Sequence, residues 1–214
     1  MALRLIVGGL VRLSSGEVRD IDEAALRDGK VGSRHYGEMC VPVEGEFMQH
    51  VKQGGMESEE LVLVDLADWL AESWEEGVRY VFGPGSTLHG LAQNLGLETT
   101  LLGVDVIENG QVIARDVTEA QLFALIDGHP ARLLVTAIGG QGHIIGRGNQ
   151  QISPRVLRAI GLEHLRVIAT KRKLGTLEGR PLRVDSGGPA LDEAFPDAVR
   201  VWSGYREELL YPLA

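Results

Sequence analysis

The sequence TAIGGQGHIIGRGNQQISP, residues 136–154, lies between an apolar segment and a predicted helix. The apolar segment, residues 131–138, predicts a buried strand. Ser153 and Pro154 predict a helix start, because serine caps helices and proline suits the first helical position. Five of the intervening residues are glycines, which allow the backbone to approach a ligand closely. Arg147 adds a planar set of donors suited to phosphate or carboxylate. We expect a small-molecule site here; the alternative is a long, tight turn with solvated polar residues.

Strand and helix patterns alternate around this stretch, from about residue 59 onward. The predicted strands are residues 78–82, 99–106, 111–114, 131–138, 165–169, 180–184 and 199–203. The predicted helices are residues 63–74, 88–95, 118–127, 154–160 and 189–195. Such alternation predicts an α/β fold, a mostly parallel Rossmann-like sheet with helices on both faces. Residues 1–58 predict a small α+β segment and a loop, with strands at 17–21 and 39–43 and a helix at 23–27. We therefore divide the chain into 1–58 and an α/β ligand-binding domain, 59–214, with one continuous domain as the alternative.

The composition of the chain argues against several kinds of binding partner and bears on its location in the cell. The chain has 214 residues and a net charge of −9, which argues against nucleic acid or an anionic membrane as partner, because both select basic proteins. No apolar run reaches the ~18–20 residues that span a bilayer. Cys40 is the single cysteine, so an internal disulfide is excluded and a reducing, cytoplasmic location is expected.

A second glycine-rich turn, residues 83–87, has the sequence GPGST between a predicted strand and a predicted helix. Unpaired N–H groups at a helix start and the hydroxyls of Ser86 and Thr87 suit phosphate or carboxylate; the alternative is an ordinary strand-to-helix turn. Ligands of parallel sheets bind at the carboxyl ends of strands. Both glycine turns follow strands, so they can share one crevice if those strands are neighbours.

Two side chains are candidates for proton chemistry. Asp105 lies in an apolar strand pattern, where a carboxylate is costly unless it is paired or at the strand's end. His143, in the glycine-rich stretch, is a candidate general base or hydrogen-bond donor to an anion.

No histidine spacing suggests a metal site, and none is expected. The basic run at residues 171–173 is either a solvated face or a source of charge for a phosphate at the same end of the sheet. The expected ligand-binding residues are Gly83, Gly85, Ser86, Thr87, Gly139, Gly140, Gln141, Gly142, Gly146, Arg147, Asn149 and Gln150.

Four motifs together resemble a known family. They are FGPGST (82–87), LGVDV (102–106), GGQGH (139–143) with GRGNQQISP (146–154), and WSGYR (202–206). They resemble the C-terminal portion of the predicted polyphosphate- or ATP-dependent NAD kinases, the group that includes the acetoin-catabolism X proteins. The resemblance covers nearly the whole chain. It implies phosphorylation of NAD to NADP, with ATP or polyphosphate as donor and Mg²⁺ as a candidate ion.

One feature of that family is missing. Its N-terminal lobe carries a Gly-Gly-Asp-Gly motif that handles the phosphoryl donor, whereas the Gly-Gly pairs here are followed by Leu10, Met56, Gln141 and Pro189. We therefore expect a nucleotide- or phospho-ligand-binding part of such an enzyme. The activity would then need a partner chain carrying that lobe; a stand-alone relative or a homo-oligomer is the alternative.

A second resemblance points to a different class of enzyme. The order of GPGST, GVD and GQGHI is similar to the order of site loops in phosphosugar isomerases and deaminases. It implies a phosphate on Ser86 and Thr87, Asp105 as base and His143 near the ring oxygen. The motif departs at Gln141, where the deaminases place an acid. A non-catalytic regulatory subunit is the third alternative.

Overall fold

The structure, a computed structural model, describes residues 12–21, 33–43 and 59–214. The chain divides into two compact units, Met1–Met56 and Glu57–Ala214. In the first unit, β1 (Arg12–Ile21) pairs antiparallel with β2 (Ser33–Val43), with a register shift between Val18 and Arg19. The strands predicted at 17–21 and 39–43 are the ends of this longer ribbon. The helix predicted at 23–27 lies outside the described residues.

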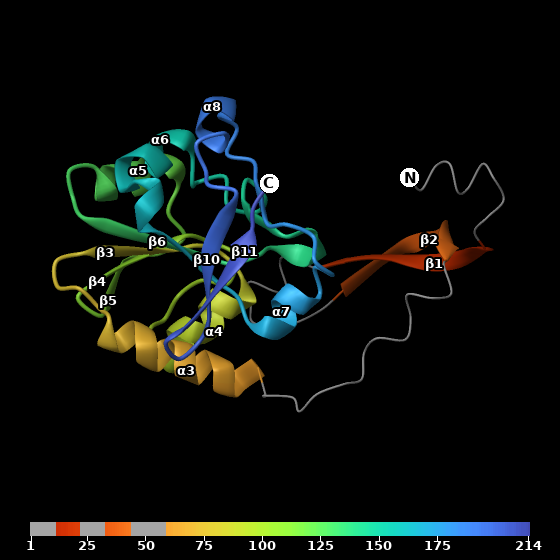
Figure 1. The fold of residues 1–214 in the computed structure, drawn as a ribbon, viewed down its shortest axis with the longest axis horizontal. Helices are drawn as coiled ribbons and strands as arrows, with labels where there is room; N and C mark the ends of the chain where they lie inside the picture. The colour runs from red at the N-terminus through yellow and green to blue at the C-terminus, as the bar shows by residue number, and fades with distance from the viewer. Residues whose placement is uncertain (1–11, 22–32, 44–58) are drawn as a thin grey trace. The chain divides into compact units, whose positions relative to one another are not determined.

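The second unit contains a seven-stranded sheet in the order β11-β10-β8-β6-β3-β4-β5 (Figure 1). Neighbouring strands among β10, β8, β6 and β3 pair in parallel, whereas β11, β4 and β5 join at the edges by antiparallel pairing. The bounds are β3 (Arg79–Phe82), β4 (Asp105–Glu108), β5 (Gln111–Ala114), β6 (Ala131–Val135), β8 (Leu165–Ile168), β10 (Ala198–Gly204) and β11 (Glu207–Pro212). The predicted α/β fold with a mostly parallel sheet is confirmed.

Helices cover both faces of this sheet (Figure 1). On one face, α3 (Glu59–Glu72) and α4 (Ser86–Asn94) pack on Tyr80, Phe82 and Leu134. On the other, α5 (Glu119–Ile126) and α6 (Pro154–Ile160) pack on Val81, Leu133 and Val135. The two sets alternate along β3 and β6, because successive side chains of a strand point to opposite faces. Two separate apolar cores result.

The helix starts read from the sequence are present. Thr118 accepts a bond from the Gln121 backbone, and the Gln121 side chain accepts one from the Thr118 N–H, which is a capping box. The Ser153 hydroxyl caps α6 at the Val156 N–H, with Pro154 at the first helical position. Local hydrogen bonding therefore fixes where both helices on this face begin.

Several short elements differ from the prediction. Residues 99–104 are irregular, with a bend at 101–103, so the strand predicted at 99–106 begins only at Asp105. The basic run is a helix, α7 (Lys171–Gly175), and the glycine-rich stretch contains a 3-10 turn, Gly139–Gln141, and a short strand, β7 (His143–Ile145). β7 pairs in parallel with β9 (Arg183–Val184), away from the main sheet. β11 was not predicted, and α8 (Pro189–Asp192) is shorter than the predicted helix.

In the ranges 12–21, 33–43 and 59–214, no helix has the length and apolar character needed to cross a membrane.

Candidate functional site

The carboxyl ends of β3 and β6 meet closely at the GPGST turn. The two strands are parallel neighbours, with Phe82 opposite Leu134. A Cβ atom at Gly85 would lie 2.8 Å from the Thr136 methyl group, and one at Gly83 would lie 3.2 Å from the Leu134 carbonyl oxygen. Gly85 also has a φ of 129°, which side-chain-bearing residues rarely adopt. These two glycines therefore let the turn lie directly against the end of the neighbouring strand.

Lys173 joins this turn to a third strand end. It lies on α7, which follows β8 and begins at Thr170, whose hydroxyl accepts a bond from the Lys173 N–H at 3.1 Å. The Lys173 Nζ donates to the hydroxyls of Thr87 and Thr136, each at 3.0 Å. Both threonines are buried, at 3% and 1% exposure. One ammonium group thus connects the carboxyl ends of β3, β6 and β8.

The charge of Lys173 is not balanced by a close carboxylate. Within the part of the chain that the structure describes, no ion pair joins its Nζ to an acidic side chain, and its two hydrogen-bond partners are neutral. Burial lowers the pKa of Lys173 to about 8, and the charge of Glu59 opposes this shift. A partly buried cation without a counter-ion is costly, and an anion placed beside it would remove much of that cost.

The start of α4 adds donors at the same place. The first backbone bond of this helix runs from the His89 N–H to the Gly85 carbonyl at 3.0 Å. The N–H groups that precede His89 in the helix therefore have no acceptor within it. Gly85, the capping residue, offers no side-chain acceptor. Donors of the first turn, the exposed Ser86 hydroxyl and the Lys173 ammonium together suit an oxyanion.

Asp105 lies at the same end of the sheet, opposite Phe82, and is 1% exposed. Its carboxylate accepts bonds from the Thr100 N–H at 2.7 Å, the Thr100 hydroxyl at 3.0 Å and the Asp116 N–H at 2.9 Å. Burial raises the pKa of Asp105, and these hydrogen bonds oppose the rise. The contacts hold the irregular segment 99–104 against the segment after β5. A role as catalytic base stays a prediction.

Packing accounts for two of the glycines in the 139–148 stretch. A Cβ atom at Gly146 would lie 1.8 Å from the Asp185 carbonyl oxygen, and one at Gly142 would lie 3.2 Å from that of Pro181. The buried Asn149 side chain accepts from the Gly146 N–H and donates to the Ile144 carbonyl, both at 2.8 Å. The stretch is therefore folded onto itself and onto residues 181–185. Binding of a ligand by these residues stays a prediction.

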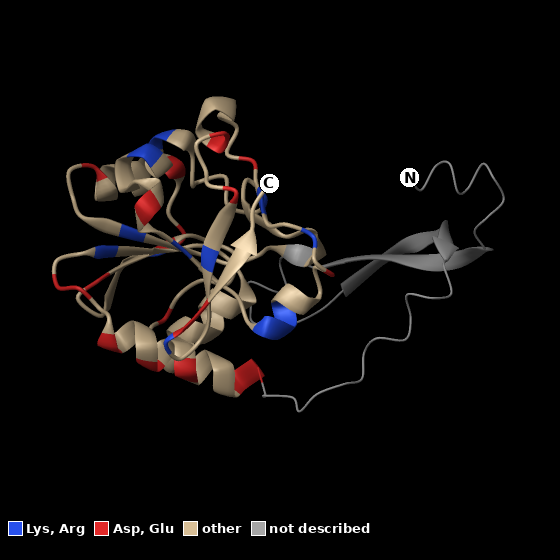
Figure 2. Cartoon of the chain, in the orientation of Figure 1, with Lys and Arg blue, Asp and Glu red and all other residues tan. Residues whose placement is uncertain are grey.

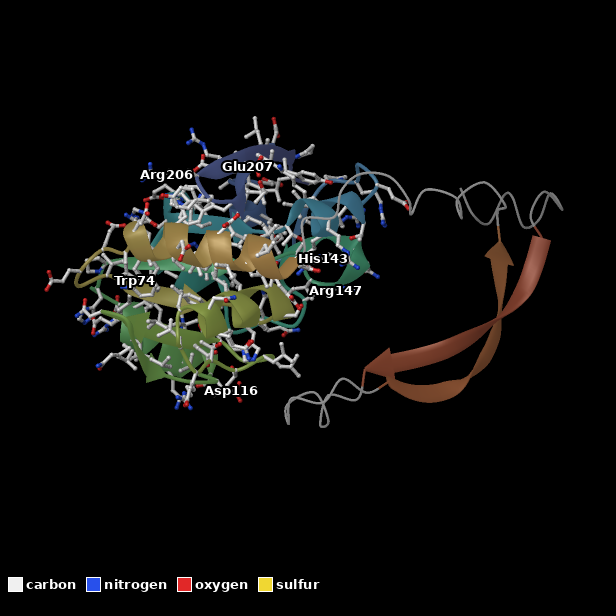
Figure 3. All side chains as sticks on the ribbon, turned by 90° about the horizontal axis from the view of Figure 1, so that it is seen from below. Trp74, Asp116, His143, Arg147, Arg206 and Glu207 are labelled. Carbon is white, nitrogen blue, oxygen red and sulfur yellow. The ribbon has the colours of Figure 1, made fainter. Side chains whose placement is uncertain are left out.

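The side chains of His143 and Arg147 lie close together at one end of the domain (Figure 3). The His143 Nδ1 is buried and has no hydrogen-bond partner among the described residues. Burial lowers the pKa of His143, the positive charges of Arg147 and Arg183 lower it further, and Asp185 opposes them. Arg147 is exposed, as are Gly140, Gln141 and Gln150. Within residues 59–214, no hydrogen bond or ion pair joins this group to Thr87 or Lys173.

Lys173 was absent from the predicted site residues, although the basic run 171–173 was noted. Its signal in the sequence was a lysine shortly after a predicted strand of a parallel sheet, where ligands bind. Figure 2 shows the basic character of α7 and the acidic residues along α3. Lys171 and Arg172 pair with Glu207 and Glu59, so the three cations of this run have different surroundings. No group of three or more His, Cys, Asp or Glu side chains that could hold a metal ion occurs among the described residues.

Comparison with known proteins gives one finding. No curated protein and no solved structure matches the chain. The family model of the ATP-NAD kinase C-terminal domain matches residues 75–213, more than half of the sequence. This range includes every strand of the seven-stranded sheet, the GPGST turn and Lys173. The chain therefore belongs to the ATP-NAD kinase C-terminal domain family.

Proposed function

We propose that the chain is the nucleotide-binding part of an NAD kinase-like phosphotransferase, and that the carboxyl ends of β3, β6 and β8 hold a phosphate group of NAD or ATP. The observation that carries the proposal is the Lys173 Nζ, which lies between Thr87 and Thr136 without a carboxylate beside it in the described residues. Family membership supports a nucleotide as the source of the anion.

The chemistry assigned to each group follows from its surroundings. The Lys173 ammonium and the first-turn N–H groups of α4 orient and neutralise a phosphate. Arg147 contacts a more distant part of the ligand. His143 is neutral near pH 7, because its pKa is lowered, and can accept the proton of a hydroxyl that becomes phosphorylated. The phosphoryl donor, ATP or polyphosphate, is handled by a Gly-Gly-Asp-Gly segment outside these 214 residues.

Binding of nucleotides to a lysine variant tests this proposal. Calorimetric titration with NAD, ATP and inorganic triphosphate is expected to show saturable binding to the native chain. Lys173→Met removes a charge-assisted contact to the phosphate, so the affinity for these ligands should fall by about 10- to 100-fold. Lys171→Met is the matched control, because its ammonium pairs with Glu207 at 2.7 Å, and it should bind as the native chain does.

The other outcomes discriminate among functions. Binding of ribose 5-phosphate in preference to NAD and ATP would replace the proposal with the phosphosugar-enzyme alternative. If none of these ligands binds, a non-catalytic subunit is favoured instead. Unchanged nucleotide affinity in Lys173→Met would refute the assigned site even within a nucleotide-binding protein.

A further inference from the structure

A cavity lies between α3 and the strands β3, β6 and β8, nearer the other end of these strands. Its volume is about 180 Å³, and Tyr80, Arg132 and Arg166, each the second residue of its strand, line it. The site at Lys173 follows the last residues of these strands. Arg132 and Arg166 lie four residues before Thr136 and Thr170 of that site, roughly 13 Å along an extended strand at ~3.3 Å per residue. The cavity is therefore distinct from the proposed nucleotide site.

The charges around this cavity do not cancel. Arg132 pairs with Glu75 through its Nε at 2.9 Å and its Nη2 at 3.0 Å. Arg166 donates only from Nη1, to the carbonyl oxygens of Glu163 at 2.7 Å and Leu165 at 2.9 Å. Within residues 59–214, neither its Nε nor its Nη2 has an acceptor, and no carboxylate pairs with it. Two arginines and one glutamate leave one positive charge.

The environment of Arg166 makes that charge costly. Burial lowers the pKa of Arg166, and the nearby charges of Arg132 and Arg200 lower it further, whereas those of Glu208 and Glu75 oppose the shift. Ser73 and Tyr80 add polar groups to the wall, and its apolar part is formed by Leu70, Leu134 and Trp202, which are at most 9% exposed. The Arg132 side chain is 23% exposed, so the cavity borders solvent and a small molecule can reach it. A half-buried guanidinium with unused donors beside an apolar wall is suited to an amphipathic anion.

We propose that this cavity binds a small monocarboxylate. Its carboxylate accepts from the Nε and Nη2 of Arg166, a planar pair of donors that matches two carboxylate oxygens. Its short apolar stem lies against Leu134 and Trp202. The volume excludes a nucleotide, since pockets for larger ligands measure about 300–1,000 Å³. The single net positive charge favours a monoanion over phosphate, because Glu75 would repel the second negative charge.

Titration of the full chain with acetate, propionate and inorganic phosphate tests the proposal. Propionate should bind saturably and more tightly than acetate or phosphate, at constant ionic strength. It should change tryptophan fluorescence, because Trp202 lines the cavity and stacks on Trp69 with ring centroids 4.1 Å apart. Arg166→Gln should weaken propionate binding by about 10- to 100-fold. Arg200→Gln is the matched control: this arginine is 77% exposed, pairs with Glu208 and does not line the cavity, so affinity should not change.

If Arg166→Gln does not fold, the titration of the native chain and of Arg166→Lys still tests the proposal. Arg166→Lys retains the charge but not the planar pair of donors, so propionate should bind about tenfold more weakly or worse. No saturable fluorescence change with the native chain would overturn the proposal. Preference for phosphate, or native affinity in either Arg166 variant, would also overturn it. Lys173→Met should bind propionate as the native chain does. If this variant loses propionate binding, propionate binds at the proposed nucleotide site, and the assignment to the Arg166 cavity is wrong.

Discussion

Lys173 shows how a single residue can connect stability to binding. Its ammonium holds the ends of three parallel strands through Thr87 and Thr136, at the cost of burying a charge. Its pKa is lowered to about 8 in the folded chain, whereas an unfolded lysine titrates near 10.4. Burial of the charged lysine lowers the free energy of unfolding, and an anion bound beside it would offset this cost.

The lowered pKa predicts a specific dependence of stability on pH. Below pH 8 both states carry the proton, so the cost of burial is fully present. Between about pH 8 and 10.4 the unfolded state binds more protons, so this residue makes the folded state more stable as pH rises. The native chain should therefore gain on the order of 1–3 kcal/mol relative to Lys173→Met between pH 7 and 10. Urea unfolding of both proteins at these pH values measures the gain; parallel stability profiles would contradict it.

Among elements, the stretch from β7 to α6 is where a polar side chain replaces regular hydrogen bonding. The buried Asn149 accepts from the Gly146 N–H and donates to the Ile144 carbonyl. Asn149→Ala should leave both backbone groups unsatisfied and cost about 2–4 kcal/mol of unfolding free energy. Gln150→Ala, at the exposed neighbouring position, should change stability by less than about 0.5 kcal/mol. Chemical denaturation compares the two, and equal losses would mean that Asn149 does not hold the turn.

The elements with strong local signals were predicted, and those made by distant contacts were not. The capping box at Thr118 and the start of α6 after Ser153 depend on residues within one helical turn. β7 and β11 are strands only because β9 and β10 lie beside them, and the irregular segment 99–104 is held by hydrogen bonds from Thr100 to Asp105. No local periodicity carries that information.

The same limit applies to the candidate site. Ligand binding by the two glycine turns stays a prediction, because composition alone cannot distinguish approach to a ligand from approach to the protein's own backbone. At Gly146 the close neighbour is the Asp185 carbonyl, a residue far along the chain. Lys173 was missed because its threonine partners are 37 and 86 residues away in sequence.

At the scale of the whole molecule, the arrangement of strands decides which turns can cooperate. The order β8-β6-β3 places three neighbouring parallel strands so that the segments that follow them meet at one end of the sheet. Lys173 connects the strands at that end through its hydrogen bonds, and the arginine-lined cavity lies nearer their other end. The two proposed ligands would therefore contact different residues of the same strands.

Residues 57–214 should fold and bind without the preceding unit. The chain divides at Met56, and the described residues of both apolar cores lie between Val62 and Leu213. The Lys173 site and the Arg166 cavity also lie within this range. A fragment of residues 57–214 is expected to unfold cooperatively, with a midpoint within a few degrees of the full chain, since a loss of about 1 kcal/mol would shift it by about 2–8 °C. It should bind triphosphate with the affinity of the full chain in the same calorimetric titration. A fragment that aggregates, or that folds but loses triphosphate, would mean that residues 1–56 complete the core or the site.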